Sequence, residues 1–553
     1  MNKLLKNKEF QIKIATIFIA FILITPQLFS NNGITLFVDS IFHLNRFYDT
    51  YMQIKDHNFQ PFIMMYGFDS IGRYINSLYG PLLSYFCGLM LYLVHSYHNF
   101  QLTFNFIILL CAGLSTNYML KVGRIKTKFR LYGIITYMVS FPVMCWIINS
   151  KFMGVGAAIM PFVIATGIRM VLDPDRPVKI TEMVFAMVLV IQVHVLSAVI
   201  GTCYLMLTFI YALLNKKTNK WILWKNSIVS AILTIILTMN VWLVYLVLST
   251  QNELLNPFPY DPYNHAVRWL NSSENVMASL IFICFCVILF FIFKNNFDRS
   301  INFLGWIGVI TIAISSGIFP WSTVFHLVKG VSILQFPSRL SPVGFLLIIF
   351  VGLYSLQYWN LAASEEKIVL ITTKIIVLME IMQCITLFTN AIGQWEQPIV
   401  HLNAGYYVKL KHGDYVLQKS FQSKDLGSPW NVIQKSVEDY LPATKQTSTW
   451  TNPNATVSVK HSNNKKMSDQ YVNVYLNDKK FHKKVKNGHI IISWKQNKNE
   501  EITIPIAHYK GTTYKVNGKK VKSRNVKTGK SGSSIIYGEK GTNKAIIGYK
   551  FKI

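Results

Sequence analysis

Charged residues are scarce in this chain. Only 14% of its 553 residues are Asp, Glu, Lys or Arg, whereas 52% are hydrophobic. An ordinary soluble chain is about one quarter charged, so a single soluble globular enzyme is excluded. The scarcity is also uneven, because residues 401–553 hold 28 Lys and Arg against 9 Asp and Glu, a net +19 of the chain's +30. The sequence therefore predicts an apolar domain over residues 1–395 and a polar domain over residues 396–553.

Cysteine is absent from the polar domain. All seven cysteines lie in apolar runs: Cys87, Cys111, Cys145, Cys203, Cys284, Cys286 and Cys384. A disulfide framework and a Cys-based zinc site are therefore excluded in the polar domain. The sequence also shows no P-loop, no dinucleotide fingerprint, no hydrolase elbow and no zinc-spaced cluster of three histidines. No cofactor and no metal site are predicted, and a requirement for a divalent metal stays open.

Long uncharged runs fill the apolar domain. Spanning a bilayer takes roughly 20 apolar residues, and only a helix satisfies their backbone groups in lipid. The runs are Ile14–Phe29, Leu82–Tyr97, Leu102–Tyr118, Leu131–Asn149, Phe152–Ile168, Met183–Leu214, Ser227–Ser249, Met277–Phe293, Ile301–Phe319, Pro342–Ala362 and Val369–Ala391. Met183–Leu214 is long enough for two spans, broken near His194–Ser197. We expect a polytopic α-helical membrane protein with about 10–13 transmembrane helices.

Lys and Arg gather in short segments that are expected to face the cytoplasm. These are the residues before the first run, 121–130, 169–179, 216–225 and 294–299. The external loop 31–80 and the C-terminal domain are then extracytoplasmic, and the first run is expected to be a retained anchor. This arrangement conflicts with two spans at Leu82–Tyr97 and Leu102–Tyr118. Either one of the two is re-entrant, or the charge rule fails there.

Asp39, His43 and Arg46 follow the first apolar run. In a helix they are spaced i, i+4 and i+7 and share one face. A carboxylate, an imidazole and a guanidinium would then point together from the membrane surface. The other interpretation is an amphipathic interfacial helix with an internal ion pair.

Polar residues at membrane depth are costly and often functional. His194 lies at the break in a long run, where it either faces a wet cavity or bonds a neighbouring helix. Arg339 lies among prolines at a membrane boundary, where it either holds a phosphate or reaches lipid headgroups. Lys329 belongs to the same loop, and Glu380 is an acid inside the last run without an evident local partner.

Four short motifs occur in a defined order. They are Asp39, His43, Leu44 and Arg46; Tyr79, Pro81 and Leu82; His194 and Ser197; and Gln335, Phe336, Pro337 and Arg339. In this order they resemble the bacterial membrane family labelled "6-pyruvoyl-tetrahydropterin synthase-related" and, through it, the GT-C superfamily of polyprenyl-phosphate-sugar glycosyltransferases. Two departures stand out, because Ser338 occupies a position where the family usually has Trp, and Lys151–Pro161 contains no acid.

The resemblance implies a GT-C-like fold in the plasma membrane and inverting transfer of a sugar to an envelope glycan or lipid acceptor. Asp39 would be the general base, and Arg46, Lys329 and Arg339 would hold the departing polyprenyl phosphate. His43 and His194 would also contact substrate. Two other functions stay open: a transporter or flippase of lipid-linked envelope precursors, and a non-catalytic envelope assembly protein.

The polar domain is expected to be β-rich. Its predicted strands are Tyr471–Leu476, His489–Trp494, Glu501–Ile506, Thr512–Val516 and Ala545–Phe551. Asn517-Gly518 predicts a tight hairpin turn. The positive charge suits an anionic envelope polymer or lipid headgroups, whereas the expected side of the membrane argues against nucleic acid. A basic solvated surface with no specific ligand is the alternative.

Overall fold

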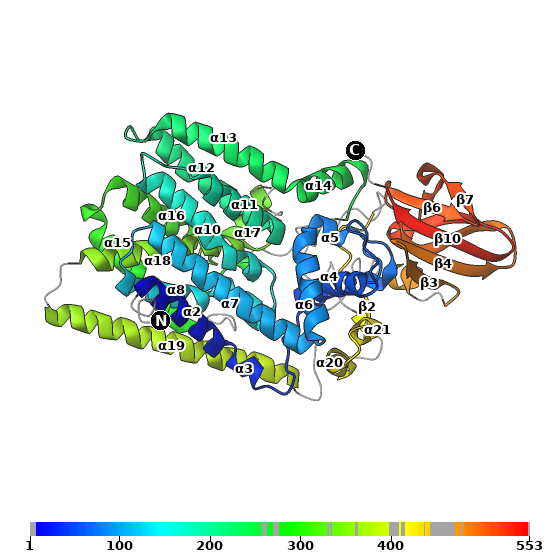
Figure 1. Cartoon of the computed structure of the whole chain (residues 1–553), viewed down its shortest axis with the longest axis horizontal. Helices are drawn as coiled ribbons and strands as arrows, with labels where there is room; N and C mark the ends of the chain where they lie inside the picture. The colour runs from blue at the N-terminus through cyan, green and yellow to red at the C-terminus, as the bar shows by residue number, and fades with distance from the viewer. Residues whose placement is uncertain are drawn as a thin grey trace. The chain divides into compact units, whose positions relative to one another are not determined.

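The computed structural model describes residues 7–255, 257, 263–268, 276–328, 331, 334–359, 363–396, 409–410, 415–435, 437–442, 470–476 and 479–550. The chain is mostly helical and carries β-sheets in its C-terminal part (Figure 1). It divides into two compact units. The first comprises Met1–Thr35, Gln101–Thr238 and Tyr260–Glu396, and the second comprises Leu36–Phe100, Met239–Pro259 and Gln397–Ile553.

The first unit is a bundle of apolar helices. They are α2 (Lys8–Leu23), α3 (Thr25–Leu28), α7 (Tyr97–Val122, whose first turn belongs to the second unit), α8 (Thr127–Met138), α9 (Phe141–Asn149), α10 (Met153–Leu172), α11 (Ile180–Val193), α12 (Val195–Leu214), α13 (Lys220–Leu237), α15 (Met277–Phe293), α16 (Arg299–Ser315), α17 (Trp321–Leu327), α18 (Ser341–Tyr358) and α19 (Ala363–Glu396), with short 3₁₀ turns η2 (Tyr263–His265), η3 (Lys294–Asn296) and η5 (Pro337–Leu340). Such a set of apolar helices is typical of a polytopic membrane protein.

Seven helices within the described residues are long and apolar enough to cross a membrane: α7, α10, α12, α13, α15, α18 and α19. Each has at least 18 residues, which at 1.5 Å per residue is about 27 Å, close to the thickness of the hydrocarbon core. The pair α8 and α9, bent by 42°, makes an eighth if it counts as one span. Three further apolar helices are shorter: α6, α11 and α16.

The number of full-length spans falls below the expected 10–13 because helix breaks, which composition does not reveal, divide several runs. Met183–Leu214 is broken where predicted, since α11 ends at Val193 and α12 begins at Val195. The run Leu131–Asn149 is divided between α8 and α9.

The helix α6 (Pro81–Val94) has 14 residues and packs along α4 (Val38–Lys55) in the second unit. Its length of about 21 Å is too short for a perpendicular span. Gly88 permits the close approach, because a Cβ there would lie 2.4 Å from Thr50 Oγ1 and 2.7 Å from Tyr51 N. Of the two runs that conflicted, only the second, which becomes α7, has spanning length.

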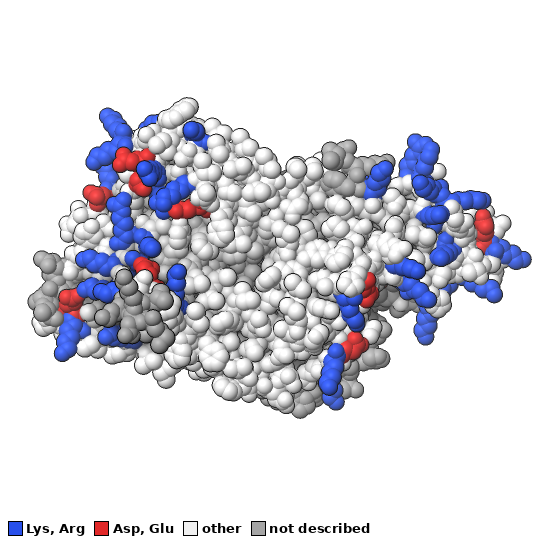
Figure 2. All heavy atoms as spheres, in the orientation of Figure 1, with Lys and Arg blue, Asp and Glu red and all other residues white. Residues whose placement is uncertain are grey.

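The basic loops lie at one end of the first unit. Glu9 pairs with Arg130, Lys128 pairs with Glu366 at 2.6 Å, and Asn219 N donates to Pro174 O at 2.9 Å. Figure 2 shows blue side chains gathered at this end of the helical unit and a nearly uncharged surface along the rest of its visible face. The uneven charge of the sequence is therefore an uneven charge of the folded unit.

The second unit contains the β-sheets and several helices. The helices are α4, α5 (Ile75–Leu78), α6, α14 (Met239–Gln251), α20 (Tyr415–Gln422) and α21 (Ser428–Val432), with 3₁₀ turns η1 (Phe68–Ser70), η6 (Ser523–Asn525) and η7 (Lys530–Gly532). The strands are β1 (Lys409–Leu410), β2 (Ile433–Lys435), β3 (His482–Lys486), β4 (His489–Gln496), β5 (Glu500–Ala507), β6 (Thr512–Val516), β7 (Lys519–Val521), β8 (Lys527–Thr528), β9 (Ser533–Gly538) and β10 (Gly541–Tyr549). They form antiparallel sheets in the orders β1-β2, β3-β4-β10-β6-β7 and β5-β9-β8.

Four of the five predicted strands are confirmed, as β4, β5, β6 and β10. The hairpin turn is also confirmed, because Asn517 and Gly518 have φ of 47° and 83°, as a type I′ turn requires. The fifth prediction is wrong, since residues 470–475 are helical. Their apparent alternation has another origin: Tyr471 and Tyr475, one helical turn apart, are both buried.

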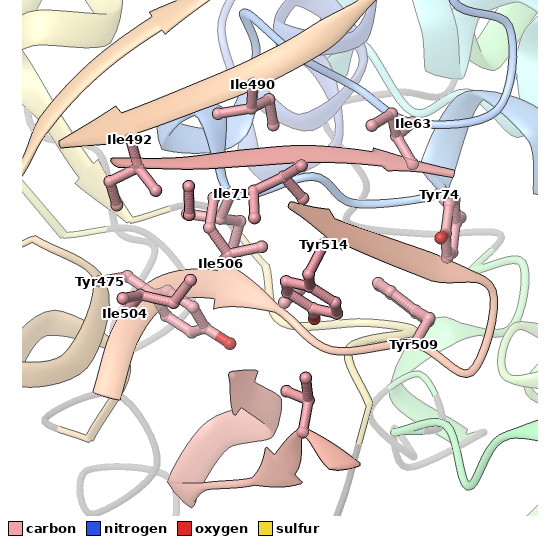
Figure 3. Packing of buried hydrophobic residues seen from close by; sticks show 14 of the residues in the cluster. Ile63, Ile71, Tyr74, Tyr475, Ile490, Ile492, Ile504, Ile506, Tyr509 and Tyr514 are labelled. Carbon is pink, nitrogen blue, oxygen red and sulfur yellow. The ribbon is translucent and has the colours of Figure 1, made fainter. Parts of the chain in front are cut away.

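The core of the β-sheets includes residues from the loop that follows the first apolar run (Figure 3). Ile490 and Ile492 of β4 and Ile504 and Ile506 of β5 are fully buried, together with Ile63, Ile71 and Tyr74. The C-terminal sheets and loop 31–80 therefore share one hydrophobic core. The predicted boundary at residue 396 falls where the chain passes into this unit, which also contains two earlier segments.

Buried polar contacts fix the same loop. Arg73 is fully buried and donates to Val437 O at 2.7 Å and to Asp439 O at 2.5 Å. Tyr471 donates its hydroxyl to Asp69 Oδ2 at 3.0 Å. Asp69 has a φ of 61°, and both its chain neighbours also have positive φ, a conformation that costs about 1–2 kcal/mol per residue. The surrounding contacts stabilise this left-handed turn.

Candidate functional site

The predicted site residues fall into both units. Asp39, His43 and Arg46 belong to the second unit, and His194 and Arg339 belong to the first. Lys329 lies outside the described residues. The two groups are therefore described separately.

The helix α4 has the conformation that the spacing predicted. Ser40 Oγ accepts the N–H of Phe37 at 2.7 Å and donates to Phe37 O at 2.9 Å, which caps the helix. Asp39 thereby lies in the first helical turn, half-buried. A carboxylate in this position is stabilised by the positive end of the helix dipole.

Arg46 is enclosed by neutral hydrogen-bond partners. Its Nε donates to Asn76 Oδ1 at 3.0 Å, and its Nη2 donates to Ser84 Oγ at 2.7 Å. Its Nη1 lies 2.8 Å from His43 Nδ1. Burial lowers the pKa of Arg46 to about 10, so the guanidinium still carries its charge at neutral pH. A buried positive charge attracts anions toward this part of α4.

The contact with Arg46 sets the tautomer of His43. A guanidinium only donates hydrogen bonds, so Nδ1 of His43 accepts and the neutral ring carries its proton on Nε2. His43 is buried, with its ring centroid 5.6 Å from that of Tyr79. The imidazole therefore presents Nε2–H as a donor.

Tyr79 lies at the centre of this cluster. The Arg46 guanidinium lies 4.8 Å from its ring centroid, and the Tyr440 ring lies 6.0 Å away. Burial and, after it, the charge of Asp439 raise the pKa of Tyr79 to about 12, and Asp39 contributes in the same direction. The hydroxyl thus stays protonated at neutral pH. Asp39, His43, Arg46 and Tyr79 form what we name the α4 cluster.

Several members of this neighbourhood were missed from the sequence. Tyr79 was noted only as part of a helix start, and Asn76 and Ser84 carried no recognisable signal. Tyr440 lies about 360 residues further along the chain. Only the shared core of the second unit brings it to Tyr79, so no local pattern could have found it.

In the first unit, His194 separates two helices. It ends α11 and caps α12, since its Nδ1 accepts Ser197 N at 3.2 Å and lies 2.7 Å from Ser197 Oγ. Gly156 packs against the pair, because a Cβ there would lie 2.4 Å from Ser197 Oγ. The sequence alternatives for His194 were a wet cavity and a hydrogen bond to a neighbouring helix, and the described contact is one that caps its own helix.

Arg339 lies near His194, close enough for the two charges to interact. Its Nη1 donates to Leu334 O at 2.8 Å and to Gln335 Oε1 at 3.1 Å, and its guanidinium lies 4.4 Å from the Phe336 ring centroid. These contacts hold Arg339 half-buried in the turn before α18. The two residues that the motif order singled out in the first unit are therefore neighbours.

Glu380 is the other polar residue of interest in the first unit. It is fully buried in α19, and the Thr136 hydroxyl of α8 lies 3.0 Å and 3.1 Å from its two carboxylate oxygens. The local partner that the sequence did not reveal is thus on another helix. Among the described residues, no three His, Cys, Asp or Glu side chains are grouped as metal ligands.

Comparisons with known proteins give no relative. No protein-family model matches the chain, and no curated protein matches it.

Proposed function

We propose that the protein is a GT-C-type glycosyltransferase of the plasma membrane. It moves a sugar from a polyprenyl-phosphate donor to an envelope glycan or lipid acceptor on the outer face. The observation that supports this most is the α4 cluster, in which a half-buried carboxylate lies beside an enclosed cation, an imidazole and a neutral tyrosine. A body of apolar helices accompanies it, as a lipid-linked donor requires.

In this reaction Asp39 accepts the proton of the acceptor hydroxyl. The acceptor oxygen attacks the anomeric carbon from the face opposite the phosphate, which inverts the configuration. The bond from the anomeric carbon to the phosphate oxygen breaks, and its electron pair leaves with polyprenyl phosphate. The guanidiniums of Arg46 and Arg339 and the amine of Lys329 favour the anion that forms. His43 and His194 donate from Nε2 to substrate oxygens.

The enclosed position of Arg46 refines its role within the proposal. Its printed donors bind protein groups, so Arg46 contributes a fixed positive field and holds the His43 tautomer. Arg339 is less enclosed and is the better candidate for direct phosphate contact.

The proposed orientation places the basic loops and the N-terminus in the cytoplasm. It rests on the clustering of Lys and Arg at one end of the first unit. The second unit, with its sheets and the α4 cluster, is then extracytoplasmic.

The test is the Asp39→Asn variant. Membranes that contain it should transfer sugar at least about 100-fold more slowly than wild type, because general-base catalysis contributes about 10²–10⁴-fold. Protein level and membrane insertion should be unchanged. The matched control is Asp56→Asn, which removes an exposed carboxylate at the other end of α4. Undiminished product from Asp39→Asn, with the control also active, would remove the base assignment.

A transporter or flippase is the second candidate, favoured by Glu380. A buried acid inside an apolar helix is a frequent element of proton-coupled transport. Glu380→Gln keeps the size of the side chain but cannot change charge. A flippase that depends on Glu380 would accumulate lipid-linked precursor on the inner leaflet in this variant, whereas a transferase would retain activity. The third function, a non-catalytic assembly protein, predicts that both variants are tolerated.

A further inference from the structure

One face of the five-stranded sheet is lined by lysines. In β4, alternate residues point outward, and the strand register extends the same face to the other four strands. The outward charged residues are Lys484, Lys486, Lys495, Lys515, Lys520 and Lys544, accompanied by His482 and His489, and all are exposed. We name this set the basic sheet face. Figure 2 shows blue side chains over the part of the molecule where Figure 1 draws these strands.

The basic sheet face contains no acid to balance it. The strands β3, β4, β6, β7 and β10 contain no Asp or Glu at all. The three-stranded sheet differs, because Lys527 pairs with Glu501 at 2.7 Å and Lys498 pairs with Glu500 at 3.5 Å. Among the described residues, the six face lysines form no such ion pair. The charge is therefore a property of this face and not of the whole β region.

The face also has an internal electrostatic cost. Lys515 and Lys520 stand directly opposite each other on β6 and β7. Like charges in opposite positions destabilise a sheet by a few tenths of a kcal/mol or more. A solvated surface without a ligand would gain from one acid at either position. The uncompensated arrangement is instead suited to an anionic partner, which would screen the repulsion.

The shape of the sheet selects the kind of partner. Neighbouring strands twist by about 20–25°, so four strand-to-strand steps turn the face by about 80–100° between β3 and β7. A planar lipid surface cannot contact both edges of such a face at once. A flexible chain can follow the twist from Lys484 to Lys520. The apolar residues between them, Ile491 and Ile546, are only half-exposed and offer little to insert into lipid.

We propose that the basic sheet face binds a linear, flexible polyanion that bears repeated phosphate or carboxylate groups. This goes beyond the proposed transfer reaction, since none of the face residues belongs to the α4 cluster. Binding holds the second unit on an anionic polymer whether or not Asp39 acts as a base. The surface recognises charge density and backbone flexibility, because lysine acts as a point charge with no fixed geometry.

The experiment uses the full chain in a non-ionic detergent, with fluorescently labelled long-chain inorganic polyphosphate as the probe. The test variant is the triple K484Q/K515Q/K544Q, with one change on each of β3, β6 and β10. The control is the triple K498Q/K527Q/K540Q, which removes the same charge from exposed positions outside the face. Basic loops of the first unit give a background that both triples share, so the difference between them isolates the face.

Wild type should bind polyphosphate with an affinity that falls as salt rises. One lysine beside an anionic surface contributes about fivefold, so the test triple should bind about 100-fold more weakly. Its slope of log affinity against log salt should fall by about 2, as counterion release predicts for three lost contacts. The control triple should lose less than about tenfold, because screened or paired lysines contribute less.

Equal losses in the two triples, or no polyphosphate binding by wild type, would overturn the proposal. A third arm uses vesicles that contain phosphatidylglycerol. If the test triple loses vesicle binding but retains polyphosphate binding, the face is a lipid-binding surface and the polymer proposal is wrong. Unchanged thermal unfolding of both triples would show that the differences are not due to misfolding.

Discussion

Asp49 offers the sharpest test of how the loop beside the α4 cluster is held. It is fully buried on α4, and its Oδ1 accepts the amides of Met65 and Tyr66 at 2.7 Å and of Gly67 at 3.1 Å. Its Oδ2 accepts Gln53 Nε2 at 2.7 Å. The Asp49→Ala variant would leave three backbone donors without this acceptor.

Each orphaned buried amide costs about 1–3 kcal/mol, and water that enters the new space compensates part of it. We expect Asp49→Ala to destabilise the loop by about 4 kcal/mol. The matched variant Asp49→Asn keeps an oxygen for the amides but loses the charge and the bond from Gln53. Its expected cost is about 1–2 kcal/mol, the difference between a charge-assisted and a neutral hydrogen bond.

Hydrogen exchange by mass spectrometry measures the effect where it occurs. A loss of 4 kcal/mol corresponds to about 10³-fold faster opening, so the amides of residues 65–67 should lose about three decades of protection in Asp49→Ala. Amides of β4 serve as the internal reference. If protection of residues 65–67 in Asp49→Ala stays within tenfold of wild type, the carboxylate does not hold the loop.

Three further predictions concern packing, pH and the buried acid. Gly88→Ala should destabilise the second unit by about 2–3 kcal/mol because α6 must move away from α4, whereas Gly393→Ala, whose Cβ meets no atom within 4 Å, should be neutral or stabilising; thermal unfolding distinguishes them. Burial raises the pKa of Asp49 from 3.8 to about 6 and lowers that of His508 from 6.5 to about 4. The stability from Asp49 is lost as pH rises from about 4 to 6, while that from His508 is gained between about 4 and 6.5, each about 3 kcal/mol. Urea unfolding of wild type should therefore change little over this range, and Asp49→Asn should become about 3 kcal/mol more stable as pH rises; an equal slope in both proteins would contradict the balance. Glu380→Gln should keep the helix packing, because an amide oxygen still accepts the Thr136 hydroxyl, and a fall of more than a few degrees in the unfolding temperature would show that the carboxylate itself is needed.

Much of the secondary structure was accessible from local patterns. Apolar runs of spanning length gave the helical unit, because lipid leaves the backbone no other hydrogen-bond partners. Alternation predicted β4 and β6, and Asn517-Gly518 predicted the turn between β6 and β7. The helix α4 was predicted from the spacing of Asp39, His43 and Arg46. Each of these depends on residues within about one or two turns of one another.

The errors arose where burial and not alternation decided the outcome. Tyr471–Leu476 alternates like a strand but is helical, since Tyr471 and Tyr475 both reach buried partners on one side. The number of full-length spans was too high because apolar content does not mark helix breaks, such as the one at His194. The roles of the six predicted site residues stay predictions.

The sequence by itself determined that the chain has an apolar helical body and a basic, cysteine-free β-rich part, because hydropathy, charge and cysteine content are sums over residues. Only the tertiary structure decided that loop 31–80 belongs to the same core as the C-terminal sheets, with Arg73 bonded to Val437 and Asp439. It also decided that Tyr440 lies beside Tyr79 and that six lysines share one face of a sheet. Such contacts join residues hundreds of positions apart. Their free energy comes from burial and strand register, and neither is visible in a local stretch of sequence.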